Sequence, residues 1–331
     1  MRLYSIDTTA RSGVSGQIWQ YLYFRLLGEA FGFTFSCARV GFAHFDLSHL
    51  LNLPGAVDVT LNPFDDSFEP ISFTEAFACL DDPDKLRDKE RISIVFDYNY
   101  WRQFAAFDAK ITNYLASDAD LQSRVTAIVA TMRESARIGN PITASDPYTI
   151  VVHARIGEQF KFKLKYSWLY TIAKSKILSF ILLPCLPAMR CLDKQSCAKL
   201  RDYIDALLDS LQDQRASSLQ PSRVVLFSDG LWCIEDTFHN PMLAKYLNRC
   251  YLDDVKSAVD ESYVDYTSAS SELAIRYFAH CDLLLHGLGG FAPTIFHMYN
   301  RKANSRLAQF AGRRWGAGTL LRLVESSRIL R

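Results

Sequence analysis

The spacing of apolar and polar residues predicts that the chain opens with a strand, a loop, a helix and a second strand. Residues 2–7 form the first strand candidate, and a loop of small residues, 8–16, follows it. Within 17–31 the apolar residues recur every three or four positions, as on one face of a helix. Residues 33–40 form the next strand candidate. This order is typical of a βαβ unit.

The rest of the first half predicts a loop, a strand and two helices. The stretch 52–88 is rich in Pro and Asp and predicts a loop with short turns. An apolar run at 92–96 predicts a strand, and helical spacing follows at 101–115 and 120–138. Gly139-Asn140-Pro141 then ends the helical pattern, because a residue before proline disfavours helical backbone. We therefore expect a domain boundary at this point.

The second half returns to alternating strands and helices. Residues 148–153 form a continuous apolar run, as in a parallel strand buried on both faces. The other elements expected are a helix over 193–214, a strand over 223–227, a helix over 272–280, a strand over 283–285 and a helix over 292–300. The pattern predicts an α/β protein with two domains, 1–140 and 141–331. Ligands are expected at the carboxyl ends of the strands and in the cleft between the domains.

Composition narrows the class of protein. The chain has 331 residues, of which 49% are apolar, and its 37 Lys and Arg nearly balance its 36 Asp and Glu. This balance argues against a surface built for nucleic acid. The eight cysteines form no CxxC pair and no metal-type spacing with histidine, so we expect reduced thiols, no metal site and a cytoplasmic protein. The longest apolar stretch, 177–183, is too short to span a bilayer.

Three expected strand ends in the second half carry residues suited to a nucleotide. Arg155 follows the first of these strands and can form two parallel hydrogen bonds with a phosphate. Ser228-Asp229-Gly230 follows the second, where it can contact a ribose or a base edge. The third end is a glycine-rich turn, residues 286–291, whose backbone N–H groups suit a pyrophosphate. Together the three ends predict a nucleotide site.

Four segments, in this order, resemble the GDP-fucose-dependent fucosyltransferase superfamily, which includes α-1,2-, α-1,6- and protein O-fucosyltransferases. Residues 12–21, SGVSGQIWQY, resemble the glycine-rich opening of the family. Residues 151–158, VVHARIGE, resemble its strand followed by HxRRxD. Phe227-Ser228-Asp229 resembles its FSDD strand end, and residues 281–291 resemble its last donor motif.

The resemblance implies a fold, an activity and a set of partners. It implies two Rossmann-like domains facing a cleft, a GT-B-like fold, with the acceptor site shaped by the first domain and the GDP-sugar bound by the second. The implied activity is inverting transfer of a sugar, fucose above all, from a GDP-sugar to a hydroxyl of a glycan or lipid-linked glycan. Neither a metal nor another cofactor is expected.

The resemblance also assigns roles to individual residues. The implied donor contacts are His153, Arg155, Ser228, Asp229, Gly289, Gly290 and Phe291. Arg155 is expected to stabilise the charge that develops on the β-phosphate as GDP leaves. Apart from the resemblance, Glu158 is the candidate base for the acceptor hydroxyl because it is the nearest carboxylate in sequence, and Asp7, at the end of the first strand, is its rival. Ser15, Gly16 and Gln17 belong to the expected acceptor-side loop.

Structural alternatives stay open for several of these residues. Arg155 can instead be an ion-pair partner, His153 a core histidine, and Asp229 the cap of a helix. The family has a second Arg where this chain has Ile156, and Asp where it has Glu158. A non-catalytic protein that binds a nucleotide or a glycan on the same fold is therefore the alternative function.

The segment 159–192 is basic and aromatic. It contains Lys and Arg but no Asp or Glu, and Tyr166, Trp168 and Tyr170 lie among its basic residues. One interpretation, which we favour, is a lid or helical hairpin packed on the domain surface. The other is contact with an anionic membrane surface or a lipid-linked acceptor, which would make the protein peripheral to the membrane.

Overall fold

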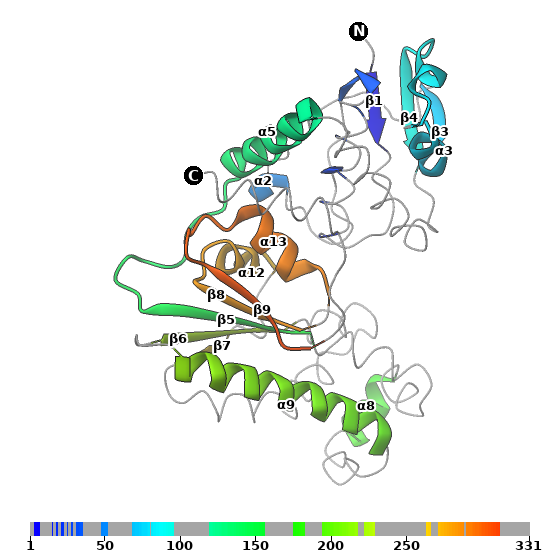
Figure 1. The fold of residues 1–331 in the computed structure, drawn as a ribbon. Coiled ribbons are helices and arrows are strands. Elements are labelled where there is room, and N and C mark those ends of the chain that lie inside the picture. Colours follow the sequence, from blue (N-terminus) through cyan, green and yellow to red (C-terminus); the bar gives the residue numbers. More distant parts are fainter. Residues whose placement is uncertain are drawn as a thin grey trace. The chain divides into compact units, whose positions relative to one another are not determined.

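The structure is a computed structural model of the full chain (Figure 1). The residues it describes are 3–6, 15, 18, 21, 22, 25, 28, 31–35, 48–51, 68–79, 81–95, 119–155, 175–182, 194–217, 222–228, 263–265, 271–287 and 289–311. They divide into two compact units. The first contains the described residues up to Gly139 together with His297–Ala303, and the second contains Asn140–Phe296 and residues 304–311.

The first unit contains a four-stranded parallel sheet. Its strands are β1 (Leu3–Ile6), β2 (Thr34–Phe35), β3 (Glu69–Ser72) and β4 (Arg91–Val95). They lie in the order β2-β1-β4-β3. Between β1 and β2, the described positions from Ser15 to Phe31 are helical, and Ile18, Tyr21 and Leu22 are buried. The predicted strand–helix–strand opening is therefore confirmed in the residues described.

The prediction of a loop over 52–88 is wrong for its second half. Strand β3 is followed directly by helix α3 (Phe73–Ala78), and a 3-10 helix, η1, covers Pro83–Leu86. Pro70 is tolerated because β3 is an edge strand, where one side of the backbone needs no partner. Ser72 begins α3 by accepting a hydrogen bond from the backbone N–H of Glu75 at 3.1 Å.

A long helix follows the first sheet in sequence. Helix α5 spans Ala119–Ser135, which confirms the helix predicted over 120–138 but ends it sooner. The short helix α2 (Ser48–Leu51) is tied to the end of α5 by a hydrogen bond from Arg137 N–H to the Leu50 carbonyl, 2.7 Å. The helix predicted over 101–115 lies outside the described residues.

The second unit contains a five-stranded parallel sheet. Its strands are β5 (Tyr148–Ala154), β6 (Ser222–Ser228), β7 (Tyr263–Asp265), β8 (Leu283–His286) and β9 (Arg306–Gln309). They lie in the order β7-β6-β5-β8-β9. The chain runs from β5 outward to β7 and then returns to the other side of β5 to form β8 and β9. The direction of winding thus reverses between β5 and β8, and ligands of open α/β sheets bind at the carboxyl ends beside such a point.

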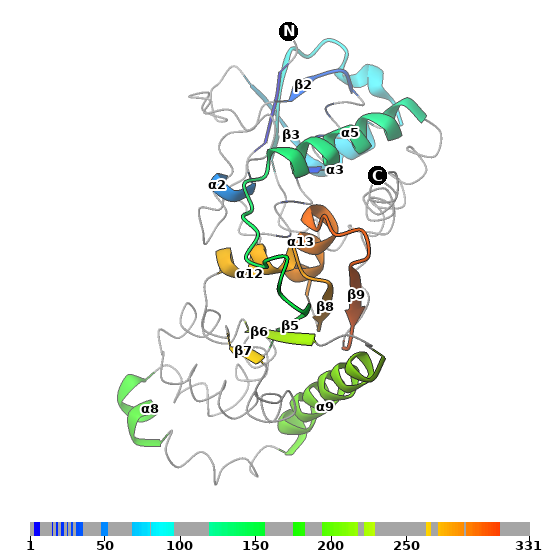
Figure 2. The same ribbon diagram turned by 90° about the vertical axis from the view of Figure 1, so that its left-hand side faces the viewer.

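Helices cover both faces of this sheet (Figures 1 and 2). Helix α9 (Lys194–Ser217) covers one face, and its Leu207 and Leu211 pack with Val152 and other alternate strand residues. Helix α12 (Ser271–Phe278) and the first part of α13 (Phe291–Tyr299) cover the other. The predicted second-half strands and helices are confirmed, and the sequence missed β7 and β9. The short helix α8 (Lys176–Leu182) lies in the segment 159–192, for which a lid or helical hairpin was one interpretation.

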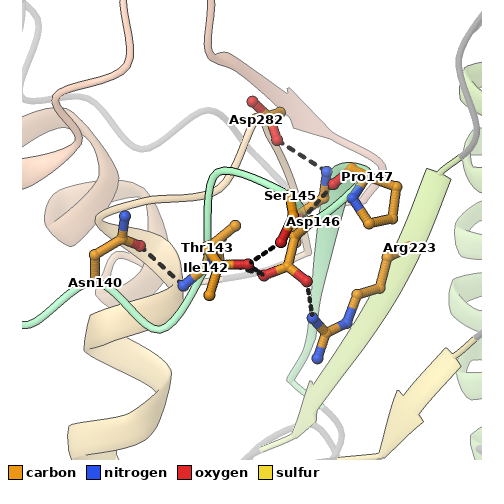
Figure 3. A network of polar contacts seen from close by, with 9 residues as sticks. Asn140, Ile142, Thr143, Ser145, Asp146, Pro147, Arg223 and Asp282 are labelled. Carbon is orange, nitrogen blue, oxygen red and sulfur yellow. Dashed lines mark hydrogen bonds and ion pairs between the residues drawn. The ribbon is translucent and has the colours of Figure 1, made fainter.

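Polar contacts hold the amino ends of the strands (Figure 3). The Asp146 carboxylate accepts a hydrogen bond from the Thr143 backbone N–H at 2.6 Å and pairs with Arg223 at 3.2 Å. The Thr143 N–H in particular lowers the pKa of Asp146 below its ordinary value. Asp282, just before β8, accepts from the Thr149 N–H at 2.9 Å. These carboxylates therefore serve the fold, at the end of the sheet opposite to the predicted site.

Candidate functional site at the ends of β5 and β8

Some of the predicted site residues lie where β5 and β8 end, namely His153, Arg155, Gly289, Gly290 and Phe291. Strands β5 and β8 run in register, with His153 opposite His286. Arg155 follows β5 and Gly287 follows β8, so both lie at the carboxyl ends of the strands of this sheet. The winding reverses between these two strands, and two of the three segments predicted to bind a nucleotide follow them; the third follows β6, one strand away, and only its Ser228 is described.

The guanidinium of Arg155 lies against the backbone of Gly289. A Cβ at position 289 would lie 2.6 Å from Arg155 Cζ and closer still to Nη1, so a side chain there would require the end of the Arg155 side chain to move. Gly289 also has a φ of 101°, a conformation that favours glycine. Two residues predicted from separate motifs are thus in contact, and the glycine is what lets the cation lie beside this turn.

Tyr203 is a site residue that the sequence analysis missed. It reaches the edge of the sheet from α9, where its hydroxyl accepts a hydrogen bond from the Arg155 backbone N–H at 2.9 Å. A Cβ at Gly287 would lie 2.6 Å from the ring carbon Cζ of Tyr203, so this second glycine makes room for the ring. The sequence offers one signal for this role. Tyr203 lies on the apolar face of a helix, and the hydroxyl of a buried tyrosine needs a hydrogen-bond partner.

Two buried histidines stand beside this contact. The His153 ring packs edge-on against Phe278 at 5.3 Å and Phe291 at 6.1 Å, measured between ring centroids. Burial, with the neighbouring charge of Arg155 and the nearby His286, lowers the pKa of His153 to about 3. His286 Nδ1 lies 2.9 Å from the Gly287 carbonyl, and because a carbonyl only accepts, this nitrogen carries the proton.

Burial lowers the pKa of His286 as well, to about 4. Both rings are therefore neutral at pH 7, and they pack and hydrogen-bond without adding charge to the site. Of the described residues at this end of the sheet, Arg155 supplies the positive charge. The structure shows the His153 ring packed among aromatic side chains, and its predicted contact with the donor stays a prediction.

Helix α13 begins directly after the glycines. The Gly290 carbonyl accepts from the Thr294 N–H at 2.9 Å, which starts the helical hydrogen-bond pattern. The first N–H groups of a helix have no partner within it, and the positive end of the helix dipole lies there. Phe291, the first residue of the helix, packs its ring on His153 and Phe278. Its predicted contact with a donor stays a prediction.

The remaining candidates are only partly described. Ser228 ends β6 opposite Ala154, one strand away from Arg155. Ser15 is helical and half-buried in the first unit, so the loop predicted over 8–16 is wrong at this position. Asp7, Gly16, Gln17, Glu158 and Asp229 lie outside the described residues. Their predicted roles, including that of Glu158 as a base, stay predictions.

The described part of the chain contains no cluster of three or more His, Cys, Asp or Glu residues that could hold a metal ion. The two cysteines with described side chains, Cys79 and Cys281, are buried thiols. Burial, reinforced by the nearby Glu75 carboxylate, raises the pKa of the Cys79 thiol and so favours its protonated, unreactive form.

A guanidinium beside the amino end of a helix suits one kind of ligand. Arginine forms paired hydrogen bonds with phosphate, and the N–H groups at a helix start bind anions. Comparison with protein-family models, with curated proteins and with solved structures finds no match to this chain. What the site does is therefore inferred from the chemistry of these residues.

Proposed function

We propose that this protein is an inverting glycosyltransferase that moves fucose from GDP-fucose to a hydroxyl of a glycan. The observation that carries the proposal is the contact of the Arg155 guanidinium with Gly289, directly before α13. A pyrophosphate at this edge of the sheet would meet a fixed cation and the positive end of a helix together. The four sequence segments that resemble the fucosyltransferases supply the identity of the nucleotide and of the sugar.

The proposed reaction needs stabilisation of a leaving group. The acceptor oxygen bonds to C1 of the sugar from the face opposite to GDP, and the C1–O bond to the β-phosphate breaks. The electron pair of that bond goes to the β-phosphate, where Arg155 stabilises the charge. One such donor is typically worth about 3 kcal/mol of the barrier. The proton of the acceptor hydroxyl goes to a carboxylate, for which Glu158 is the candidate.

The proposal extends to the architecture. We assign a GT-B-like fold with two Rossmann-like domains, in which 1–140 serves the acceptor, through Ser15, Gly16 and Gln17, and 141–331 binds the donor. Support comes from the parallel sheet in each unit and from the reversal of winding between β5 and β8. The proposed mechanism uses the chain's own cation and helix start, and it calls for no metal ion or other cofactor.

The second candidate function is binding without catalysis. The sequence favours it at one position, because Ile156 stands where the resembling family has a second arginine. With one cation fewer beside the pyrophosphate, the same site can hold a GDP-sugar or a glycan without cleaving the donor. The two functions share the nucleotide site and differ only in turnover.

One pair of measurements separates the two functions. The full chain is titrated with GDP, and it is then incubated with GDP-fucose and a panel of glycans while released GDP and fucosylated product are measured. Transfer with inversion at C1, read by NMR of the product, supports the enzyme. GDP binding without turnover on any acceptor selects the binding protein, and a chain that does not bind GDP contradicts the nucleotide site in both functions.

A further inference from the structure

Helix α8 (Lys176–Leu182) presents large apolar side chains to solvent. Four of them are exposed: Ile177 by 74%, Leu178 by 37%, Phe180 by 68% and Ile181 by 58%. Among the described residues these are the exposed large hydrophobic side chains, and all four lie on this one helix of seven residues. Single exposed apolar residues are normal on a protein surface, whereas a group of this kind indicates an interaction site.

The four side chains form one face of the helix. At 100° per residue, the positions of Phe180, Ile177, Ile181 and Leu178 fall within an arc of about 160°. The N–H of Leu178 donates to the Ser175 Oγ at 3.2 Å, which caps the start of the helix. The four apolar side chains therefore lie on one side because this segment is helical.

The surrounding sequence is strongly positive. The segment 159–192 contains no Asp or Glu, although the whole chain has 37 basic and 36 acidic residues. Its basic residues are Lys161, Lys163, Lys165, Lys174, Lys176 and Arg190. Tyr166, Trp168 and Tyr170 precede the helix, and these residue types favour the boundary between water and lipid.

We propose that α8 lays its apolar face into the surface of an anionic membrane. Such a surface offers acyl chains to the four apolar side chains and negative headgroups to the basic residues of the flanking sequence. A second copy of this chain would bring the same positive charge to the contact, and the two would repel. The proposal is independent of the nucleotide site, so GDP binding and membrane binding can fail separately.

The test is flotation of the full chain with vesicles at low salt. One set of vesicles is phosphatidylcholine alone, and the other contains about 30% phosphatidylserine. We expect at least about tenfold tighter binding to the anionic vesicles, and weaker binding as salt is added. Equal binding to both sets, or binding to neither, would overturn the proposal.

Two variant pairs test the helix and the charge separately. Ile177→Ser with Phe180→Ser should weaken binding to anionic vesicles at least about tenfold, whereas Ile177→Leu with Phe180→Leu should keep it. Because both positions are exposed, we expect neither substitution to disturb the fold, and an unchanged thermal unfolding temperature checks this. Vesicle binding that is unchanged in the serine variant would overturn the proposal. A protein that binds no vesicles but self-associates, and loses that self-association in the serine variant, would overturn it too.

The charge pair is Lys174→Ala with Lys176→Ala. It should weaken binding to anionic vesicles several-fold and leave binding to neutral vesicles unchanged. The matched control removes two exposed charges from the first unit, Lys85→Ala with Arg87→Ala, and should change neither. Equal effects of the two pairs would show that only the net charge matters, which would overturn the assignment to this segment.

Discussion

At the scale of the residue, the absence of one side chain determines where the site's cation lies. Arg155 and Gly289 come from separate motifs, and the guanidinium occupies the space that a Cβ at position 289 would need. Gly287 makes the same kind of room for the Tyr203 ring. The glycines of this turn therefore serve two neighbouring side chains as well as the conformation of the loop.

Gly289→Ala tests this account against a matched glycine. Gly32 also has positive φ, 68°, but a Cβ there would meet nothing within 4 Å. We expect Gly32→Ala to lower the free energy of unfolding by about 1–2 kcal/mol, through backbone strain alone, and to leave GDP affinity unchanged. Gly289→Ala should carry a similar cost from backbone strain, because the end of the Arg155 side chain can move, but it should weaken GDP binding, since that movement displaces the guanidinium. Urea unfolding and GDP titration measure both quantities, and equal effects of the two substitutions on GDP affinity would refute the account.

The two buried histidines predict a pH dependence of stability. Their pKa values in the folded protein, about 3 for His153 and about 4 for His286, lie below the ordinary value of 6.5. Between about pH 6.5 and 4 the unfolded chain therefore binds more protons than the folded one. Their contribution to stability is complete above about pH 6.5 and is lost as the pH falls through this window.

Each histidine should add up to about 1.4 kcal/mol per pH unit to the slope of the free energy of unfolding. Urea unfolding at pH 7, 6 and 5 measures that slope. His286→Asn, which keeps a donor for the Gly287 carbonyl, should reduce it by the share of one histidine. A slope that His286→Asn leaves unchanged would show that this ring does not titrate as its burial implies.

At the scale of the element, the last turn of α13 is held by a buried arginine from α5. Arg133 donates from Nε to the Met298 carbonyl at 2.6 Å and from Nη2 to the His297 carbonyl at 3.0 Å. The last carbonyls of a helix have no partner within it, and a cation there complements the helix dipole. Arg133 therefore joins two helical segments of the first unit.

Arg133→Leu should lower the free energy of unfolding by about 3 kcal/mol, because two buried carbonyls lose charged donors. Arg124 is the control on the same helix, where it pairs with Asp120 on the surface. Arg124→Leu should cost no more than about 0.5 kcal/mol. Urea unfolding of the two variants compares them, and equal costs would contradict the assigned role of Arg133.

The sequence predicted the central strands and missed most of the edges. The apolar runs at 148–153, 223–227 and 283–285 became β5, β6 and β8, which have a neighbour on each side. The missed strands β3, β7 and β9 all lie at the edge of a sheet. An edge strand is less buried and needs no continuous apolar run, so its sequence carries a weaker signal.

The site was predictable to a similar extent. The motifs identified Arg155 and Gly289, and strand order brings them to one edge. They carried no sign of Tyr203, which reaches that edge from α9 and is spaced like any other residue of an apolar helix face. Which side chain fills the space above a glycine depends on tertiary packing, which local patterns do not encode. Helix α3 could have been predicted from the sequence, because Ser72 followed three residues later by Glu75 is a recognised signal for the start of a helix.

At the scale of the whole molecule, the two ends of the second sheet serve different purposes. The carboxyl ends carry Arg155 and the glycine turn, and the amino ends carry a network of carboxylates that hold the strands. The net charge of +1 likewise hides a local imbalance, since the basic residues of 159–192 have no acidic partner within that segment. No helix in the described part of the chain is long and apolar enough to cross a membrane.

This division predicts that stability and ligand binding can be changed separately. Asp282→Ala removes the acceptor for the Thr149 N–H at the amino end of β5. It should cost about 1–2 kcal/mol of the free energy of unfolding and leave GDP affinity unchanged. Urea unfolding and GDP titration of the same variant check both statements. A large loss of GDP affinity in a folded Asp282→Ala protein would mean that the two ends are not independent.

The central claim is that Arg155 binds the pyrophosphate of a GDP-sugar, and calorimetric titration of GDP tests it most directly. Loss of a charged hydrogen-bond donor is worth about 1.5–3 kcal/mol, so Arg155→Ala should raise the Kd for GDP about 10- to 150-fold. Arg87→Ala, an exposed arginine of the first unit, should leave the Kd unchanged. An unchanged Kd in a folded Arg155→Ala protein, or a wild-type chain that does not bind GDP, would contradict the claim.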